Sequence, residues 1–133
     1  MEEKEKMKAI LFDTDGVMDL SNEDMKSLIE NVRNKGIKCY MVTNQPSSSP
    51  LFDGIFCSAE LGVKKPSQEF YKKVFAVISK ENIEKEDVLY VDDSETNVLA
   101  GIEFGFSPLH YSSFEEFKEE LDLMIASNSQ KSY

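Results

Sequence analysis

The sequence predicts an α/β fold, a three-layer sandwich in which a central parallel sheet of about five strands lies between two layers of helices. Short, continuous apolar runs alternate along the chain with segments whose apolar residues recur at helical spacing. The runs do not alternate apolar with polar residues, which is typical of strands buried on both faces. The 133 residues fit a single domain, 1–133, whose polar ends at 1–7 and 127–133 are expected to be flexible tails.

Five apolar runs are predicted to be strands: residues 8–12, 37–42, 54–57, 88–91 and 108–111. The first reads KAILF and ends at Asp13, and the fourth reads VLYV and ends at Asp92–Asp93. The fifth run is a weak candidate.

Four segments are predicted to be helices: residues 22–35, 67–80, 94–104 and 113–125. Ser21 or Asn22 can cap the first helix and Gly36 can end it. The inner face of the second helix is expected to hold Phe70, Val74, Val77 and Ile78. Ser113 and Glu116 have the spacing of a capping box at the start of the fourth helix.

The charge and cysteine content narrow the function classes. The net charge of −10 and the lack of a basic run argue against a nucleic-acid or anionic-membrane partner. No apolar run is long enough to span a bilayer and the first residues do not resemble a secretion signal, so a cytoplasmic location is expected. Cys39 and Cys57 are expected to be buried free thiols.

Polar side chains follow the predicted strands at the point where each one ends. These side chains belong to Asp13, Asp15, Thr43, Asp92 and Asp93. In a parallel, Rossmann-like sheet, ligands bind outside the carboxyl ends of the strands, so the fold would gather these groups at one edge. Up to four carboxylates would then converge, and a hard cation with oxygen ligands, Mg²⁺ above all, would relieve their repulsion.

Each of these short patterns also has a plainer interpretation. Alone, Asp13-Thr14-Asp15-Gly16 is typical of a polar turn, and Thr43-Asn44 is typical of a turn at a strand end. Lys65 before Pro66 reads by itself as an ordinary helix start, although its ammonium group could also grip an anion. Asp92–Asp93 could simply be an acidic pair at the start of the next helix, where the helix dipole stabilises carboxylates.

Four segments in this order resemble the motifs of the haloacid dehalogenase-like (HAD) superfamily: ILFDTDGV at 10–17, YMVTN at 40–44, LGVKKP at 61–66 and VLYVDDSETNV at 88–98. The resemblance extends over residues 8–121. It implies a Mg²⁺-dependent phosphatase that hydrolyses phosphomonoesters through an aspartyl-phosphate. The implied substrate is a phosphorylated small molecule or a phosphoprotein.

The resemblance also implies a role for each matching residue. Asp13 would be the nucleophile, Asp15 the general acid and base, and Lys65 a further catalytic residue. The phosphate would be bound by Thr14, Thr43, Asn44 and Lys65. Mg²⁺ would be held by Asp13, the carbonyl oxygen of Asp15 and Asp93, with Asp92 and Asn97 supporting these ligands from behind.

The chain departs from many members of the superfamily because it leaves no room for a cap domain. Only residues 18–21 separate the first motif from the first helix, and residues 45–53 form a short connection after the second motif. We therefore expect a HAD-like core with no cap and an open site. A homo-oligomer in which a neighbouring subunit acts as the cap stays open.

Two other function classes compete with this interpretation. A signalling receiver domain also uses an acidic pocket, a Thr and a Lys-Pro, but it needs its acceptor Asp at a middle strand, before the Thr, and no Asp lies between residues 31 and 44. The second alternative is a weak or inactive HAD-like scaffold that acts as a protein-interaction module. Among single residues, His110 is expected to have a structural role or to lie at the surface, and Tyr90 and Tyr111 are expected to be packing residues.

Overall fold

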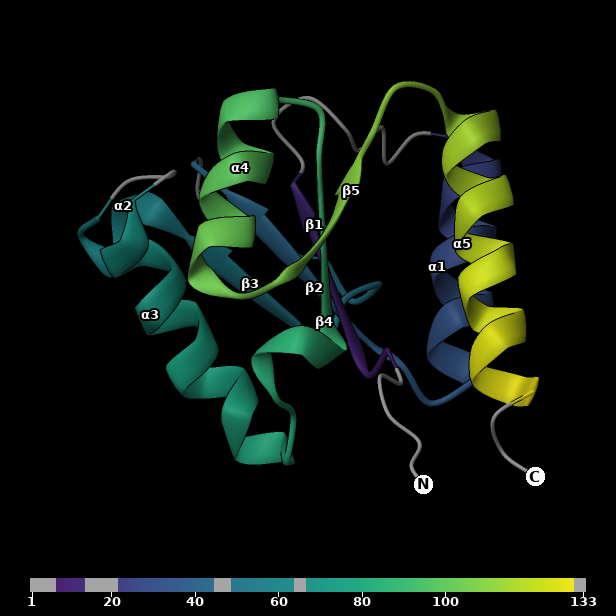
Figure 1. Cartoon of the computed structure of the whole chain (residues 1–133), viewed down its shortest axis with the longest axis horizontal. Helices are drawn as coiled ribbons and strands as arrows, with labels where there is room; N and C mark the ends of the chain where they lie inside the picture. The colour runs from purple at the N-terminus through teal and green to yellow at the C-terminus, as the bar shows by residue number, and fades with distance from the viewer. Residues whose placement is uncertain (1–6, 14–21, 45–48, 64–66, 131–133) are drawn as a thin grey trace.

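The structure, a computed structural model, describes residues 7–13, 22–44, 49–63 and 67–130. Five parallel strands form one sheet in the order β3-β2-β1-β4-β5 (Figure 1). The strands are β1 (Ala9–Asp13), β2 (Lys38–Thr43), β3 (Gly54–Cys57), β4 (Val88–Asp92) and β5 (Ser107–His110). This all-parallel sheet with helices on its faces confirms the predicted α/β class, and no cap domain is present within the described residues.

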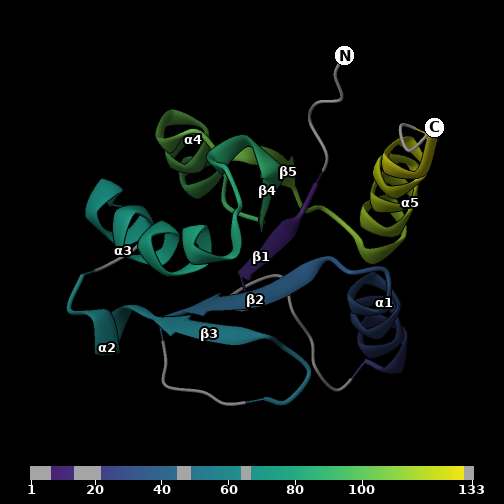
Figure 2. The same ribbon diagram turned by 90° about the horizontal axis from the view of Figure 1, so that it is seen from below.

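Five α-helices accompany the sheet: α1 (Glu23–Asn34), α2 (Ser58–Leu61), α3 (Gln68–Ile78), α4 (Glu95–Phe104) and α5 (Phe114–Gln130). Two short 3₁₀ turns, η1 (Ser79–Glu81) and η2 (Lys85–Asp87), follow α3. Helices α1 and α5 cover one face of the sheet, while α3 and α4 cover the other (Figures 1 and 2).

The two faces have separate apolar cores because successive strand residues point to opposite sides. Along β1, Ile10 and Phe12 belong to the core under α1 and α5, whereas Ala9 and Leu11 belong to the core under α3 and α4. All four are fully buried. This burial on both faces is the physical reason why the strands read as continuous apolar runs.

The strand order separates this fold from a receiver domain. Its order is that of the classic dinucleotide-binding sheet with β1 at the centre, whereas receivers follow the order 2-1-3-4-5. The central strand therefore carries Asp13 at its carboxyl end, with β2 and β4 on either side of it.

Several local expectations needed correction. Val77 was predicted to face the core but is 48% exposed. Tyr71, which was not predicted to lie on the inner face of α3, is fully buried. Helix α2 was not predicted, and α5 continues to Gln130, beyond the predicted end at residue 125. Met7, expected in a tail, packs against the core under α1 and α5.

The predicted caps are largely confirmed. The Asn22 side chain accepts from the backbone N–H groups of Asp24 and Met25, as expected for the start of α1. At α5 only half of the capping box forms. The Ser113 hydroxyl accepts from the Glu116 N–H (3.2 Å), but the Glu116 carboxylate instead accepts from the Ser112 hydroxyl.

The cysteines follow the expectation, since Cys39 and Cys57 are free and buried. None of the helices in the described part of the chain is both long and apolar enough to cross a membrane.

The connection from β2 to β3 has no helix in its described part, residues 49–53. Phe52 fills the core there, with its ring centroid 6.0 Å from that of Phe12. Arg33 of α1 fastens the backbone. One of its terminal nitrogens donates to the carbonyl oxygens of Pro50 (3.2 Å) and Leu51 (3.0 Å), and the other donates to Asp53 (2.8 Å).

Asp53 in turn is hydrogen-bonded to the backbone of Cys39 in β2. Its second carboxylate oxygen accepts from the backbone N–H of Cys39 (2.8 Å), and its own N–H donates to the Cys39 carbonyl oxygen (2.7 Å). The Arg33 side chain is 34% exposed and the Asp53 side chain 18%, so this ion pair is shielded better than a surface pair.

We predict that Arg33→Ala lowers the free energy of unfolding by about 1–3 kcal/mol, because it removes three hydrogen bonds from a charged donor. Urea unfolding followed by circular dichroism measures this. Lys118→Ala is the control, since the Lys118–Asp122 pair is exposed on both sides and should contribute less than about 0.5 kcal/mol. Equal losses in the two variants would contradict the role given to Arg33.

Candidate functional site

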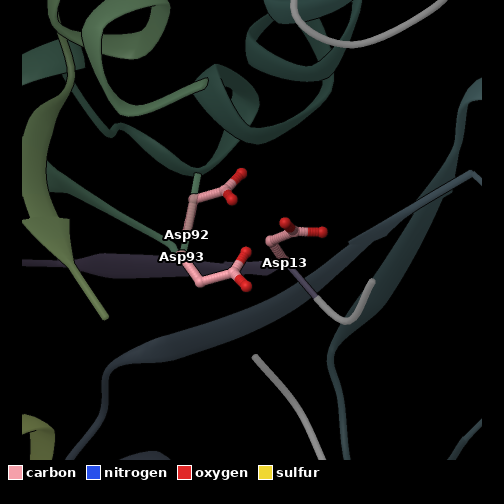
Figure 3. Close-up of side chains that lie close together, drawn as sticks. All are labelled: Asp13, Asp92 and Asp93. Carbon is pink, nitrogen blue, oxygen red and sulfur yellow. The ribbon is translucent and has the colours of Figure 1, made fainter. Parts of the chain in front are cut away.

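The carboxyl ends of β1 and β4 bring three carboxylates together. Phe12 pairs with Val91 in the parallel register, so the next residues, Asp13 and Asp92, end their strands side by side. One carboxylate oxygen from each of Asp13, Asp92 and Asp93 lies within 4.8 Å of the others (Figure 3). The structure thus confirms that acidic residues far apart in the chain meet at one edge of the sheet.

The burial of these groups makes their proximity unfavourable without a counter-charge. Asp13 is 2% exposed and Asp92 is fully buried, while Asp93 is exposed at the rim. Two negative charges that lie within 4.8 Å of each other repel by about 3 kcal/mol or more at an effective dielectric constant of about 20. Within the described part of the chain, no lysine or arginine forms an ion pair with Asp92 or Asp93.

The donor set suits a hard divalent cation. All three groups offer carboxylate oxygens, which are the ligands that Mg²⁺ prefers in proteins. The buried members supply negative charge from below and the exposed Asp93 leaves the rim accessible. The residues present therefore fit a magnesium ion.

Both oxygens of the Asp92 carboxylate accept hydrogen bonds. One accepts from the backbone N–H of Ser94 (3.0 Å). The other accepts from the hydroxyl of Tyr90 (2.9 Å) and from the side-chain amide of Asn97 (3.0 Å). These three donors offset the free energy that burying the Asp92 carboxylate would otherwise cost.

The Tyr90 hydroxyl belongs to a longer hydrogen-bond chain. It accepts from the hydroxyl of Tyr71 (3.1 Å), and both tyrosines are fully buried. Burial, with the neighbouring Tyr71 and Asp92 as smaller causes, raises the pKa of Tyr90 far above its ordinary value. Tyr90 therefore stays protonated and donates to Asp92.

The other residues at this edge have varied surroundings. Thr43 ends β2 and is 3% exposed, and Asn44 follows it at the surface, where its side-chain oxygen accepts from the Ser58 hydroxyl (2.7 Å). The His110 ring nitrogen Nε2 lies 3.0 Å from the carbonyl oxygen of Asp93.

The structure thus places six of the predicted site residues at the carboxyl edge: Asp13, Thr43, Asn44, Asp92, Asp93 and Asn97. Thr14, Asp15 and Lys65 lie outside the described residues. Sequence reasoning missed the tyrosine pair. A signal existed for Tyr90, since residues 90 and 92 of one strand must point to the same face.

Comparison with known proteins links this arrangement to a family. A sequence model of the haloacid dehalogenase-like hydrolases matches residues 18–105. The sesquiterpene phosphatase astK of Aspergillus oryzae is 36% identical over 97 residues, which cover 65% of this chain and 48% of astK. The chain thus spans about half the length of this curated relative.

Solved structures show the same fold. An uncharacterised protein from Corynebacterium glutamicum superposes with a TM-score of 0.78 at 22% identity, over 90% of this chain and 96% of that one. The HAD family enzyme bt-2542 of Bacteroides thetaiotaomicron, solved in complex with magnesium and inorganic phosphate, gives a TM-score of 0.57 at 19% identity, over 71% of this chain and 56% of its own. At these identities the likeness concerns the fold alone.

Carboxylate repulsion at the site generates a prediction about Asp93→Asn. In metal-free buffer this variant should be at least as stable as the wild type, with a gain of up to about 1 kcal/mol, because one of three clustered negative charges is removed. Thermal unfolding in the presence of a chelator measures this. Asp122→Asn is the control, since it also removes an exposed carboxylate, one that is paired with Lys118. A clear loss of stability in Asp93→Asn would contradict mutual repulsion at the site.

Proposed function

Because the chain belongs to the haloacid dehalogenase-like hydrolase family, we propose that it is a Mg²⁺-dependent phosphomonoester hydrolase that acts through an aspartyl-phosphate on Asp13. One observation carries the proposal: Asp13, at the end of the central strand, lies with Asp92 and Asp93 in a cluster that suits a divalent cation. Phosphoryl transfer depends mainly on alignment and charge neutralisation, which such a cluster with its cation supplies.

The proposed ligands of Mg²⁺ are Asp13, the carbonyl oxygen of Asp15 and Asp93. When bound, the ion neutralises charge on the phosphoryl oxygens and on the attacking carboxylate. Asp92 is not assigned as a direct ligand because both of its oxygens already accept hydrogen bonds from the protein.

The proposed reaction has two steps at phosphorus. In the first, a carboxylate oxygen of Asp13 forms a bond to phosphorus while the ester oxygen leaves, taking a proton from Asp15. In the second, Asp15 accepts a proton from water as the water oxygen attacks phosphorus, and the bond to Asp13 breaks. Inorganic phosphate is released and both carboxyl groups return to their starting states.

The remaining residues are proposed to bind the transferred phosphoryl group. Thr43 and Asn44 lie at the end of β2, next to β1, where a hydroxyl and an amide can donate to phosphate oxygens. Thr14 and Lys65 are given the same task by their positions in the motifs, with Lys65 supplying positive charge.

We propose a small phosphorylated organic molecule as the substrate. The similarity to a protein named as a sesquiterpene phosphatase supports this class over a phosphoprotein. The exposure of Asp93 and Asn44 supports a site that a substrate can reach from the rim.

We predict that Asp13→Asn lowers kcat for p-nitrophenyl phosphate by about three orders of magnitude or more, because the amide cannot act as the nucleophile. Asp15→Asn should slow turnover and leave phosphoenzyme to accumulate. Phosphate release in the presence of MgCl₂ measures both. Asp24→Asn, an exposed substitution in the first turn of α1, is the control and should match the wild type. Robust turnover by Asp13→Asn would overturn the assignment.

Removal of the metal gives an independent prediction. A chelator should abolish p-nitrophenyl phosphate hydrolysis by the wild-type protein, and excess Mg²⁺ should restore it, because the clustered carboxylates would repel an anionic substrate. Full activity after dialysis against a chelator would contradict the magnesium requirement. A folded wild-type protein that binds Mg²⁺ but releases no phosphate would instead favour the inactive scaffold.

A further inference from the structure

We propose that Tyr90 is a positioning residue of the metal site, whose hydroxyl fixes Asp92 and thereby holds Asp93 opposite Asp13. This inference rests on the proposed function, because it assigns a task to a residue behind the proposed metal ligand. The observation that carries it is the hydrogen bond of 2.9 Å from the Tyr90 hydroxyl to Asp92.

The path from Tyr90 to Asp93 runs through a short, well-fastened turn. The carboxylate of Asp92 reaches over Asp93 to accept from the N–H of Ser94 (3.0 Å), so the two neighbours of Asp93 are joined directly. The carbonyl oxygen of Asp93 also lies 3.0 Å from the His110 ring. Two contacts therefore hold the backbone around Asp93: the bond from the Ser94 N–H to Asp92 and the contact with His110. The first of these depends on the orientation of the Asp92 carboxylate.

Tyr90 is itself held in one place. Its ring lies edge-on to that of Tyr71, with centroids 5.4 Å apart. A Cβ atom on Gly101 of α4 would come within 2.5 Å of the Tyr90 ring, so the helix can approach the ring only because this residue is glycine. Glycine inside a helix costs about 1 kcal/mol relative to alanine, and close packing on the ring is what it permits here.

The hydroxyl of Tyr90 has a task that packing alone does not explain. Neighbours in the same core, such as Phe70 and Phe106, fill their space without a polar atom. A buried hydroxyl is costly unless it is bonded, and the Tyr90 hydroxyl both accepts from Tyr71 and donates to Asp92. The hydrogen bonds from Tyr71 to Tyr90 and from Tyr90 to Asp92 therefore connect the well-packed core to the edge of the sheet where the carboxylates lie.

The test is a Mg²⁺ titration of Tyr90→Phe by isothermal calorimetry. Loss of a hydrogen-bond partner of a metal ligand typically weakens metal affinity by about 10–100-fold. Tyr90 acts on the ligand Asp93 through Asp92, so we expect the Kd for Mg²⁺ to rise by about tenfold, the lower end of that range. Excess Mg²⁺ should bring kcat for p-nitrophenyl phosphate back towards the wild-type value. A purely structural role would change the unfolding midpoint without changing the Kd of the folded protein.

Two further tyrosine variants serve as controls. Tyr40→Phe removes a hydroxyl from the same core, and Tyr40 and Tyr90 occupy the same level of the sheet because both pair with Leu11. Its Kd should stay within about twofold of the wild type, since the donors to Asp92 do not include it. Tyr71→Phe should have an intermediate effect, because Tyr90 can still donate to Asp92.

The outcomes separate this inference from the proposed function. If the wild type binds Mg²⁺ and Tyr90→Phe binds it equally well, the positioning role is wrong while the proposed function stands. If Tyr90→Phe binds Mg²⁺ weakly but the wild type releases no phosphate, the positioning role is supported and the hydrolase function is wrong. If the wild type shows no saturable binding of Mg²⁺, both are wrong.

Discussion

Electrostatic repulsion among carboxylates at the end of the central sheet is the constraint on which the site depends. The parallel register of β1 and β4 forces Asp13 and Asp92 to end side by side, and Asp93 follows at the rim. The first two are buried, so water screens them poorly. A cation at this edge would reduce the repulsion, and a set of carboxylate oxygens favours a hard divalent cation.

The three carboxylates meet this constraint in different ways. The charge of Asp92 is balanced by three hydrogen-bond donors within the protein, which include the buried hydroxyl of Tyr90. Asp93 is exposed at the rim and Asp13 ends the central strand beneath it. This difference supports Asp13 and Asp93 as the groups that face a cation, with Asp92 as the residue that holds Asp93 in place. The aromatic core under α3 and α4 thus contributes to the chemistry proposed at the edge, as well as to stability.

Much of this arrangement could be predicted from the sequence because the decisive patterns are local. Continuous apolar runs mark doubly buried strands, and parallel strands bring their carboxyl ends to one edge, so the meeting of Asp13 with Asp92 and Asp93 follows from two simple rules. Long-range side-chain contacts could not be predicted in the same way. The clamp from Arg33 to Asp53 and the bond from Tyr71 to Tyr90 each join different elements. Val77 was misassigned because helical periodicity alone does not show where the apolar face of α3 is centred.

The central claim is that Asp13 and Asp93 share one divalent cation. The most direct test is a crystal structure of the wild-type protein grown with Mg²⁺ and beryllium fluoride, a mimic of a phosphoryl group on a carboxylate. The account predicts a single Mg²⁺ ion in contact with oxygens of both Asp13 and Asp93, and the mimic attached to Asp13. A Mg²⁺ ion bound elsewhere, or these two carboxylates too far apart to contact the same ion, would contradict it.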